Sequence, residues 1–464
     1  MNHFERSVAL PVSPAEAMRW HERGALSRLL PPWDGVIVEK PPASLQDGEL
    51  AELRIPIGPF SKRWVAEHFG FEADRQFCDR QTEGPFRQWE HSHRFEPTAH
   101  GCQLTDSIEF ELPGGGWGDW AAQPWVRRQL QRMFRFRHDV TSADLAFHQL
   151  HRGKEMRIAV TGSSGLVGSQ LAPFLEGGGH EVIRIVRRAP RNDHEVRWEP
   201  ERGVLDAASL EGIDAVIHLA GEGIADGRWN EAKKRRILES RVEPTKLLAR
   251  TMASMSNPPK VLVSASAIGY YGDRGDEPLD ETSAVGNSFL ADVCAGWELA
   301  TEPAANAGVR VVNGRIGIVL TPQGGALKPM LLPFKLGAGG VMGNGRQYWS
   351  CISLDDLIGS LTHCVLTDSL HGPVNLVCPE PVTNREFTKT LAKVLRRPAF
   401  LPMPAFAARL LLGEMADALI LASTRVTPTR LLDSGYPFRH PTVESALRHV
   451  LGATADVETT SQVS

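Results

Sequence analysis

The chain has 464 residues, a length that predicts two or three domains rather than one core. Its formal net charge of −4 excludes a general electrostatic attraction to nucleic acid or to an anionic membrane. The six cysteines are scattered without a Cys-x-x-Cys pair, which predicts a reducing compartment, no disulfide framework and no cysteine-based zinc site. Because we see no apolar signal segment at the N-terminus and no uninterrupted apolar span, we expect a cytoplasmic protein.

Residues 1–150 are predicted to form a separate module of strands that ends in a long helix. The run Ser13-Pro14-Ala15-Glu16 combines an N-cap serine, a proline at the first helical position and an acidic first turn, which predicts a helix toward Leu30. Strand patterns cover residues 4–10, 37–39, 50–57, 63–69, 86–95 and 102–112, and a helical pattern covers residues 125–150. The simplest arrangement of these parts is one antiparallel sheet around the last helix.

Several segments of this module carry a recognisable pattern: the helix after the first strand, GPFRQWEHSHRF, LTDSIEFELP and the terminal helix. Together they resemble the START-like, polyketide-cyclase-like ligand-binding superfamily. The resemblance implies an α+β helix-grip domain at residues 1–150, with an apolar cavity for a lipid-like or aromatic ligand. His91 and His93 share one face of a predicted strand and could ligate a metal, but the sequence shows no third ligand. We therefore interpret both as polar residues that line a cavity or a solvent face, and we predict no metal site.

The segment MRIAVTGSSGLVG, residues 156–168, is the strongest motif of the chain. A strand pattern at Arg157–Thr161 leads into a glycine turn and then into an apolar, helix-compatible run that begins near Leu166. Strand, glycine turn and helix in this order are the context in which a dinucleotide-binding fingerprint is meaningful, although an ordinary glycine turn is the alternative. The helix N-terminus would present free N–H groups to a pyrophosphate. The predicted contacts are Gly162, Ser163, Ser164, Gly165, Leu166, Val167 and Gly168.

The end of the next predicted strand, residues 181–186, bears on the choice of coenzyme. An acidic residue there would bind the ribose hydroxyls of NAD, whereas arginine accommodates the additional phosphate of NADP. The chain has Arg187-Arg188 at this place, and a guanidinium matches phosphate in charge and bidentate geometry. The sequence therefore favours NADP over NAD, and a solvated pair at a strand end is the alternative.

Strand and helix patterns continue to alternate beyond this point. Apolar strands are predicted at residues 215–221, 260–265 and 309–320, and a helix at residues 230–248. This alternation predicts a doubly wound parallel Rossmann sheet that binds ligands at the carboxyl ends of its strands. The basic run of residues 233–236 is interpreted as a solvated helix face. The strand tips supply the remaining predicted coenzyme contacts, Leu219, Ala220, Gly221, Ser264 and Ala265.

Further motifs follow the glycine turn in order: HLAGEGI, SASAIGYYGD, GRIGIVLTPQGGAL, WSCISLDD and NLVCPEPVTNREFTKTLAKVLRRP. They resemble the extended short-chain dehydrogenase/reductase superfamily and, within it, the atypical epimerase family (NAD-dependent epimerase/dehydratase-like). The resemblance implies an NAD(P)-binding Rossmann domain at residues 156–390 and a small C-terminal α/β substrate domain at residues 391–452. We expect the polar residues 453–464 to be a disordered tail.

The resemblance also implies a chemistry in which a tyrosine removes a proton from a substrate hydroxyl during hydride transfer to the nicotinamide. A lysine four residues later would lower the pKa of that tyrosine, which is otherwise near 10. None of the four tyrosines of this chain is followed by lysine at that spacing. If Glu298 fixes the alignment, Leu290 and Cys294 occupy the two positions, and neither can act as that base.

Other polar residues remain candidates for the site. The serine of the superfamily is retained as Ser266, with Ser264 as the alternative, and we take Ser266 and Tyr271 as the candidate catalytic residues. The hydroxyl of Tyr271 would orient substrate or relay a proton, and the alternative is that it packs the loop. Arg241 and Arg315 are candidates for substrate-anion or cofactor contacts, with structural ion pairs as the alternative.

Two functions follow from these features. The first is an NADP-dependent oxidoreductase or epimerase-like enzyme that acts on a small molecule, with an N-terminal module for an apolar ligand. The second is a non-catalytic NADP(H)- or ligand-responsive sensor or scaffold, since some relatives in this branch have been linked to cell or plastid division. We favour the enzyme, expect no nucleic-acid or membrane partner, and leave a homodimer open.

Overall fold

The computed structural model describes residues 1–58 and 60–453, apart from the side chains of residues 115–121. The chain divides into two compact units. The N-terminal unit contains Met1–Glu155, Pro173–Gly179 and the described residues from His449 onward, and the C-terminal unit contains Met156–Ala172 and His180–Arg448. All but the first residue of the predicted tail at residues 453–464 lies outside the described residues.

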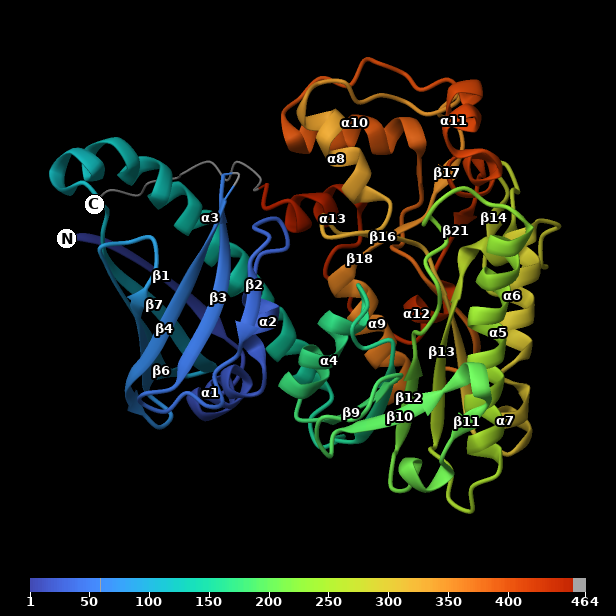
Figure 1. The fold of residues 1–464 in the computed structure, drawn as a ribbon, viewed down its shortest axis with the longest axis horizontal. Coiled ribbons are helices and arrows are strands. Elements are labelled where there is room, and N and C mark those ends of the chain that lie inside the picture. Colours follow the sequence, from blue (N-terminus) through green and yellow to red (C-terminus); the bar gives the residue numbers. More distant parts are fainter. Residues whose placement is uncertain (59, 454–464) are drawn as a thin grey trace. The chain divides into compact units, whose positions relative to one another are not determined.

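The N-terminal unit is a seven-stranded antiparallel sheet that packs on one long helix (Figure 1). Strand order is β1-β7-β6-β5-β4-β3-β2. Its elements are β1 (Asn2–Leu10), α1 (Pro14–Glu22), α2 (Ala25–Leu29), β2 (Ile37–Lys40), β3 (Leu50–Ile57), β4 (Phe60–Glu72), β5 (Gln76–Glu83), β6 (Gln88–Thr98), β7 (Gly101–Glu111) and α3 (Gly115–Leu150).

Alternation along the strands decides which side chains face α3. Phe4 of β1, Trp89 of β6, and Ile108 and Phe110 of β7 are buried against Phe134 and its neighbours on α3. These side chains lie on one face of the sheet because successive residues of a strand point to opposite sides. The apolar core of this unit is therefore a single layer between sheet and helix.

Three features of this unit differ from the sequence predictions, and the first is that α3 begins at Gly115 rather than at residue 125. Ser13 caps α1 as predicted, since its Oγ accepts the Glu16 N–H at 3.3 Å, but the helix ends before Gly24. Gly24 has a φ of +90°, which breaks the predicted helix into α1 and α2. Strand β5 was not predicted, and it places Asp79 directly opposite His91. The sequence shows no third ligand for His91 and His93, and the structure places the carboxylate of Asp79 beside them.

The C-terminal unit contains the predicted doubly wound sheet. Strand order is β11-β10-β9-β8-β12-β13-β15-β19, and all pairs except β10–β11 are parallel. The first part of the unit contains β8 (Arg157–Thr161), α4 (Gly168–Gly177), β9 (Glu181–Val186), β10 (Glu195–Glu199), β11 (Val204–Leu205), β12 (Ala215–His218), α5 (Glu231–Ala253), β13 (Val261–Ala267), α6 (Phe289–Leu299), α7 (Glu302–Asn306) and β15 (Arg310–Ile316).

Helices cover both faces of this sheet (Figure 1). Helices α5 and α7 pack on one face, where Leu248, Met252 and Ala304 join the sheet residues Val216 and Leu262 in one buried cluster. On the other face lie α4 and α9 (Leu354–Leu366), and α9 is buried along its whole length. The strands are nearly continuous apolar runs because a parallel sheet is covered on both sides.

The sequence misplaced two boundaries in this sheet. The helix after the glycine turn begins at Gly168 rather than near Leu166. The strand predicted at residues 309–320 is interrupted at Gly317 and continues as β16 (Ile318–Leu320), which pairs with β18 (Cys351–Ser353). A Cβ at residue 317 would lie 2.5 Å from the Ser350 carbonyl oxygen, so this close approach requires glycine.

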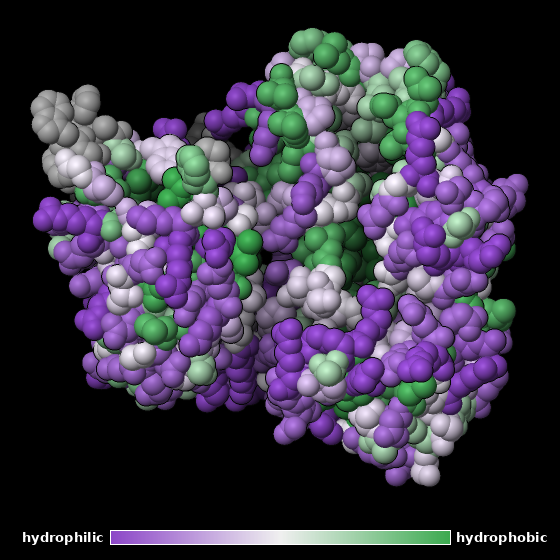
Figure 2. Space-filling view, in the orientation of Figure 1, coloured by the Kyte–Doolittle hydropathy of each residue, from purple (hydrophilic) through white to green (hydrophobic). Residues whose placement is uncertain are grey.

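The remaining elements complete the unit. They are β14 (Pro278–Leu279), α8 (Leu327–Lys335), β17 (Tyr348–Trp349), β19 (Gly372–Leu376), β20 (Val382–Thr383), α10 (Asn384–Leu395), α11 (Ala405–Leu412), β21 (Arg425–Val426), α12 (Thr429–Asp433) and α13 (Val443–Val450). Figure 2 shows apolar side chains gathered over α8, α11 and the segment before α11, where Leu336, Phe400, Phe406 and Leu410 are exposed. Among the described residues, no helix is both long and apolar enough to cross a membrane.

All six cysteines are free and buried, as expected for a chain without a disulfide framework. Burial raises the pKa of every thiol, which lowers the reactive thiolate fraction at neutral pH. The pKa rises to about 11 for Cys78 and Cys102, to about 12 for Cys294, Cys364 and Cys378, and well above its usual value for Cys351.

Asp356, at the start of α9, attaches the C-terminal segment to the sheet layer. Its buried carboxylate accepts the Ser353 hydroxyl at 2.8 Å and the backbone N–H groups of Arg439 and His440 at 2.8 and 3.0 Å. Its carbonyl oxygen accepts the Tyr436 hydroxyl at 2.9 Å. Two segments that are 80 residues apart in sequence are thus joined by one side chain and its backbone.

We expect Asp356→Asn to destabilise this unit. An amide offers one acceptor oxygen where the carboxylate has two, so its NH2 group would face backbone donors, at a cost of about 2–3 kcal/mol in the free energy of unfolding. Urea denaturation followed by circular dichroism measures the change. Asp193→Asn, on an exposed loop of the same unit, is the control. Equal stability of the two variants would show that Asp356 does not hold this segment.

Candidate functional site

The order of the parallel strands reverses between β8 and β12, which places a cleft-forming switch point at their carboxyl ends. Thr161, the last residue of β8, joins the two strand ends. Its hydroxyl oxygen accepts the backbone N–H groups of Leu219 and Ala220 at 3.0 and 3.3 Å and lies 2.7 Å from His218 Nδ1. The predicted contacts Leu219, Ala220 and Gly221 therefore stand directly beside the glycine turn.

The glycines of the turn are required by close backbone approaches. Gly162 has a φ of +67°, and a Cβ there would lie 2.9 Å from the Leu219 carbonyl oxygen. A Cβ at Gly168 would lie 2.3 Å from the Gly162 carbonyl oxygen, so α4 starts against the turn itself. Ser164 and Gly165 are exposed at the tip of the turn, Ser163 and Val167 are half-buried, and Leu166 lies beneath Gly324 of a later loop. The turn thus presents open backbone to a ligand.

The two arginines after β9 differ in their surroundings. Both are exposed, but Arg188 forms a two-pronged ion pair with Glu195 of β10, with Nη1 to Oε2 at 2.6 Å. Glu195 also accepts the Arg191 N–H at 2.8 Å. These hydrogen bonds, first that of Arg188, lower the pKa of Glu195 to about 2. Arg188 is therefore held beside a carboxylate at the edge of the site.

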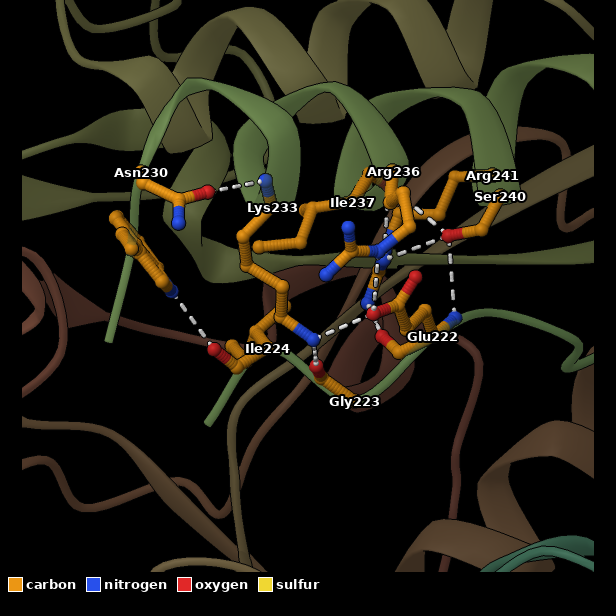
Figure 3. A network of polar contacts seen from close by, with 10 residues as sticks. Glu222, Gly223, Ile224, Asn230, Lys233, Arg236, Ile237, Ser240 and Arg241 are labelled. Carbon is orange, nitrogen blue, oxygen red and sulfur yellow. Dashed lines mark hydrogen bonds and ion pairs between the residues drawn. The ribbon is translucent and has the colours of Figure 1, made fainter. Parts of the chain in front are cut away.

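The loop after β12 is held by the first three turns of α5 (Figure 3). Lys233 Nζ donates to Glu222 Oε1 at 2.6 Å and to the Gly223 carbonyl at 2.9 Å, and Ser240 Oγ accepts the Glu222 N–H at 3.1 Å. Arg241 donates to the carbonyl oxygens of Glu222 and Ile237 at 2.9 and 3.0 Å. Arg241 thus supports the loop backbone, which is the structural alternative to the predicted ligand contact.

The burial of Lys233 shows that the basic run of residues 233–236 is not entirely a solvated helix face. Its side chain is 4% exposed, whereas Arg235 and Arg236 are exposed. The positions of Lys233, Ser240 and Arg241 follow the helical repeat and so lie on the side of α5 that meets the loop. The ion pair between Lys233 and Glu222 could not be predicted from the sequence, because Glu222 lies in a loop with no periodic pattern.

The carboxyl end of β13 carries a buried chain of polar side chains. Ser266 donates to Glu298 Oε1 at 2.7 Å, and Glu298 forms a two-pronged ion pair with Arg315 at 2.8 and 2.9 Å. Arg315 Nη1 donates to the Tyr271 hydroxyl at 3.0 Å, and that hydroxyl donates to Asn375 Oδ1 at 2.7 Å. The structure therefore brings together Ser266 and Tyr271 through Glu298 and Arg315. Ser264 is fully buried, and Ala265 lies between the two serines.

Electrostatics in this chain of contacts do not favour proton exchange by Tyr271. Burial raises its pKa to about 12, despite the neighbouring Arg315. Burial lowers the pKa of Arg315, but the ion pair with Glu298 outweighs burial and raises it overall. Arg315 also stacks on the ring of Tyr270, with its guanidinium carbon 3.5 Å from the ring centre. Tyr271 is thus a protonated partner of Arg315 at neutral pH.

Helix α6 carries the residues that replace the expected tyrosine and lysine. Leu290 and Cys294 are buried and lie against Gly269, where an added Cβ would be 3.3 Å from Leu290 and 3.7 Å from Cys294. Burial raises the pKa of Cys294 to about 12. Glu298, one turn further along α6, is the residue that sequence reasoning used only as an alignment marker. Glu298 lies four residues after Cys294, and this spacing indicates in the sequence that the two residues share one face of α6.

The comparisons with known proteins agree with this architecture. Residues 158–375 match the NAD dependent epimerase/dehydratase family, and residues 403–450 match a domain of unknown function. An epimerase family protein of Mycobacterium bovis is 44% identical over 290 residues, which are 62% of this chain and 96% of that protein. The chain belongs to this epimerase family. It also carries, at residues 10–136, a match to the polyketide cyclase/dehydrase and lipid transport family.

Solved structures resemble the chain over different extents. A nucleoside-diphosphate sugar epimerase from Corynebacterium glutamicum is 33% identical, covers 97% of this chain and 90% of its own, and has a TM-score of 0.80. The human epimerase family protein SDR39U1 (isoform 2) with NADPH is 35% identical, covers 64% and 99%, and has a TM-score of 0.59. The predicted Rossmann architecture, the epimerase-family resemblance and the START-like N-terminal domain are confirmed.

Because the Tyr271 hydroxyl is buried with two partners, we expect Tyr271→Phe to lower the free energy of unfolding by about 1–2 kcal/mol. The absorbance change at 295 nm, which reports tyrosinate, should be the same below pH 11 in Tyr271→Phe and in the parent, after allowance for any difference at high pH. Tyr270→Phe, which keeps its ring over Arg315, is the matched control. Loss of a tyrosinate signal below pH 10 in Tyr271→Phe would show that this hydroxyl ionises in the working range.

Proposed function

We propose that the C-terminal unit binds NADP(H) at the switch point between β8 and β12. The hydrogen bonds from Leu219 and Ala220 to Thr161 carry this proposal, because they fix two loops at the spacing that a dinucleotide would bridge. The contacts proposed are the turn Gly162–Gly168, Leu219, Ala220, Gly221, Ser264, Ala265, Arg187 and Arg188. The human relative whose structure was determined with NADPH supports the same coenzyme class.

Selectivity for NADP(H) over NAD(H) would come from Arg187 and Arg188. A guanidinium matches a phosphate in charge and geometry, and both side chains are exposed at the end of β9. Arg188 would exchange its ion pair with Glu195 for one with the phosphate, so Glu195 competes with the coenzyme. Removing that carboxylate should therefore favour binding.

We expect Glu195→Gln to lower the Kd for NADPH by up to about five-fold, because Arg188 could then bind the phosphate without giving up a surface ion pair. Arg188→Ala should raise the same Kd about ten-fold or more, because a hydrogen bond between charged groups is lost. Neither change should alter the Kd for NADH. Isothermal titration calorimetry measures both coenzymes, and Glu199→Gln, at the other end of β10, is the control. Tighter NADH than NADPH binding by the parent would contradict the selectivity.

We further propose that the unit is an oxidoreductase or epimerase-like enzyme for a small molecule. NADP(H) would supply or accept a hydride. The Ser266 hydroxyl donates to Glu298, which leaves the serine oxygen as an acceptor for a substrate hydroxyl. Tyr271 would take part by positioning Arg315, since its raised pKa opposes a role as base.

For the N-terminal unit we propose binding of an apolar small molecule between its sheet and α3. The match to the polyketide cyclase/dehydrase and lipid transport family supports this proposal. We also propose that residues 1–150, 156–390 and 391–452 are the three domains of the chain, with the last forming the substrate domain. A homodimer remains a separate hypothesis.

A second function, a non-catalytic NADP(H)-responsive sensor or scaffold, is favoured by one observation. Leu290 and Cys294 replace the expected tyrosine and lysine, and the nearby polar side chains of Ser266, Glu298 and Arg315 are satisfied by each other. A site whose polar groups pair internally can hold a coenzyme without turning over a substrate. The experiment below separates the two functions.

Net oxidation of NADPH, followed at 340 nm, should occur with at least one member of a panel of carbonyl compounds. For an epimerase-like reaction, which regenerates its coenzyme, at least one nucleotide sugar should instead be epimerised in the presence of NADP(H), as followed by chromatography. Ser266→Ala should then lower kcat/KM at least about ten-fold, as expected for a lost hydrogen bond to the reacting group, with the Kd for NADPH unchanged. Ser369→Ala, an exposed position, is the control. Tight NADPH binding without turnover across the panel would favour the sensor and contradict the enzyme.

A further inference from the structure

The interior of the N-terminal unit contains a group of charged and titratable side chains in an otherwise apolar layer. Asp79 of β5, His91 and His93 of β6, Asp106 of β7 and His138 of α3 come together there. Four of the five are buried, and the Asp79 side chain is 18% exposed. The rings of Phe77, Trp89, Phe95 and Phe134 surround them along the same strands and helix.

Strand register explains why these residues meet. Asp79 is the direct neighbour of His91 across β5 and β6, and His93 is the direct neighbour of Asp106 across β6 and β7. Side chains directly opposite in an antiparallel pair lie about 4.5–5.5 Å apart at their Cβ atoms, so the sheet alone enforces the grouping. The arrangement does not depend on any flexible loop.

The geometry on the Asp79 side matches a metal-binding site. Asp79 Oδ2 lies 3.1 Å from His91 Nδ1 and 3.6 Å from His93 Nε2, and the three ligand atoms all lie within 4.8 Å of one another. Ligand atoms about 2.0–2.1 Å from a tetrahedral zinc ion are separated by about 3.3–3.4 Å. The two measured separations bracket this value, so a small shift of side chains would place all three around one ion.

Asp106 lies on the opposite edges of the same two imidazoles. Its Oδ1 is 3.0 Å from His91 Nε2 and 2.7 Å from His93 Nδ1, and its Oδ2 is 2.5 Å from His138 Nε2. A carboxylate that accepts the second N–H of a ligating histidine fixes the tautomer and the ring orientation. His91 Nε2 hydrogen-bonds to Asp106 Oδ1, so a proton on that nitrogen would leave the lone pair of His91 Nδ1 directed toward Asp79. His93 Nδ1 lies close to the same oxygen without a hydrogen bond, and a proton there would likewise leave the lone pair of His93 Nε2 for the ion.

A purely structural role explains this cluster less well. Burying two carboxylates is costly, and buried ion pairs commonly contribute little net stability compared with apolar residues of similar size. Most of this layer consists of apolar side chains that pack without such a cost, and His21 and His68 are further buried polar residues beside the cluster. A bound divalent cation would compensate both carboxylates and would account for the position of every member of the cluster.

We propose that the N-terminal unit binds one divalent transition-metal ion, with Zn²⁺ the best match, through Asp79, His91 and His93. Asp106 is the positioning residue that orients both imidazoles, and His138 completes its hydrogen bonding. Two imidazole nitrogens and one carboxylate suit Zn²⁺ and its neighbours in the first transition row, whereas Ca²⁺ and Mg²⁺ prefer oxygen ligands. Three protein ligands leave a coordination position for a water or a small-molecule donor inside the domain.

The test uses the untagged full chain after treatment with a chelator. Isothermal titration calorimetry with Zn²⁺ should give one site per chain, and Co²⁺ should give the visible absorption of a four- or five-coordinate ion. Mg²⁺ and Ca²⁺ should bind at least 100-fold more weakly than Zn²⁺. Asp79→Asn, an isosteric change at the partly exposed ligand, should weaken Zn²⁺ binding at least 100-fold, and His93→Gln should do the same.

Asp106→Asn should weaken Zn²⁺ binding about 10- to 100-fold, as expected for an outer carboxylate, and should change the Co²⁺ spectrum without abolishing it. His3→Ala, at an exposed histidine on β1 of the same sheet, is the matched control and should bind Zn²⁺ as the parent does. Far-ultraviolet circular dichroism and NADPH binding report the folding of each variant, so this outcome is separate from that of the coenzyme proposal. Absence of Zn²⁺ and Co²⁺ binding by the parent, or binding unchanged in Asp79→Asn and His93→Gln, would overturn the site.

Discussion

The hydroxyl of Thr161 joins the two halves of the parallel sheet at the place where strand order reverses. It accepts two consecutive backbone N–H groups from the end of β12. That contact requires the ends of β8 and β12 to be close, and the closeness in turn requires glycine at residue 162, whose Cβ would meet the Leu219 carbonyl. The loop that follows β12 is then fixed from the other side by Lys233, Ser240 and Arg241 of α5. A ligand that spans the switch point thus meets backbone that is already ordered, which reduces the entropy lost on binding.

Side-chain pairing at the end of β13 gives this epimerase-family chain a site unlike the tyrosine–lysine arrangement that its resemblance implied. The Glu298–Arg315 ion pair lies one turn of α6 beyond Cys294, the position where the resemblance implied a lysine, and the pair is neutral overall. Its cation stacks on Tyr270 and hydrogen-bonds to Tyr271, so the aromatic residues hold the pair in place. Ser266 is linked to this ion pair through its hydrogen bond to Glu298.

Most of the fold could be predicted from the sequence, because strands β3, β8 and β9 have strong apolar patterns and turn residues at both ends. Strand β5 could not be predicted in this way, since Gln76–Glu83 has only two apolar residues, Phe77 and Cys78, and they are adjacent. Because β5 was not predicted, Asp79 was not recognised as the third member of the histidine cluster. Its place in the cluster depends on the register between strands. The coenzyme turn was found from a local motif, whereas Glu222 and Glu298 act through partners distant in sequence. Such pairings depend on tertiary packing, which spacing along the chain does not encode.

The state of the six cysteines has a practical consequence. Every thiol is buried with a raised pKa, so maleimide and similar probes would find few native thiolates to modify at neutral pH. One cysteine introduced at an exposed position in each unit would therefore carry a fluorophore or spin label selectively, without first replacing the native residues. Distances between such labels, recorded with and without nicotinamide coenzyme, would report directly whether ligand binding in one unit is communicated to the other.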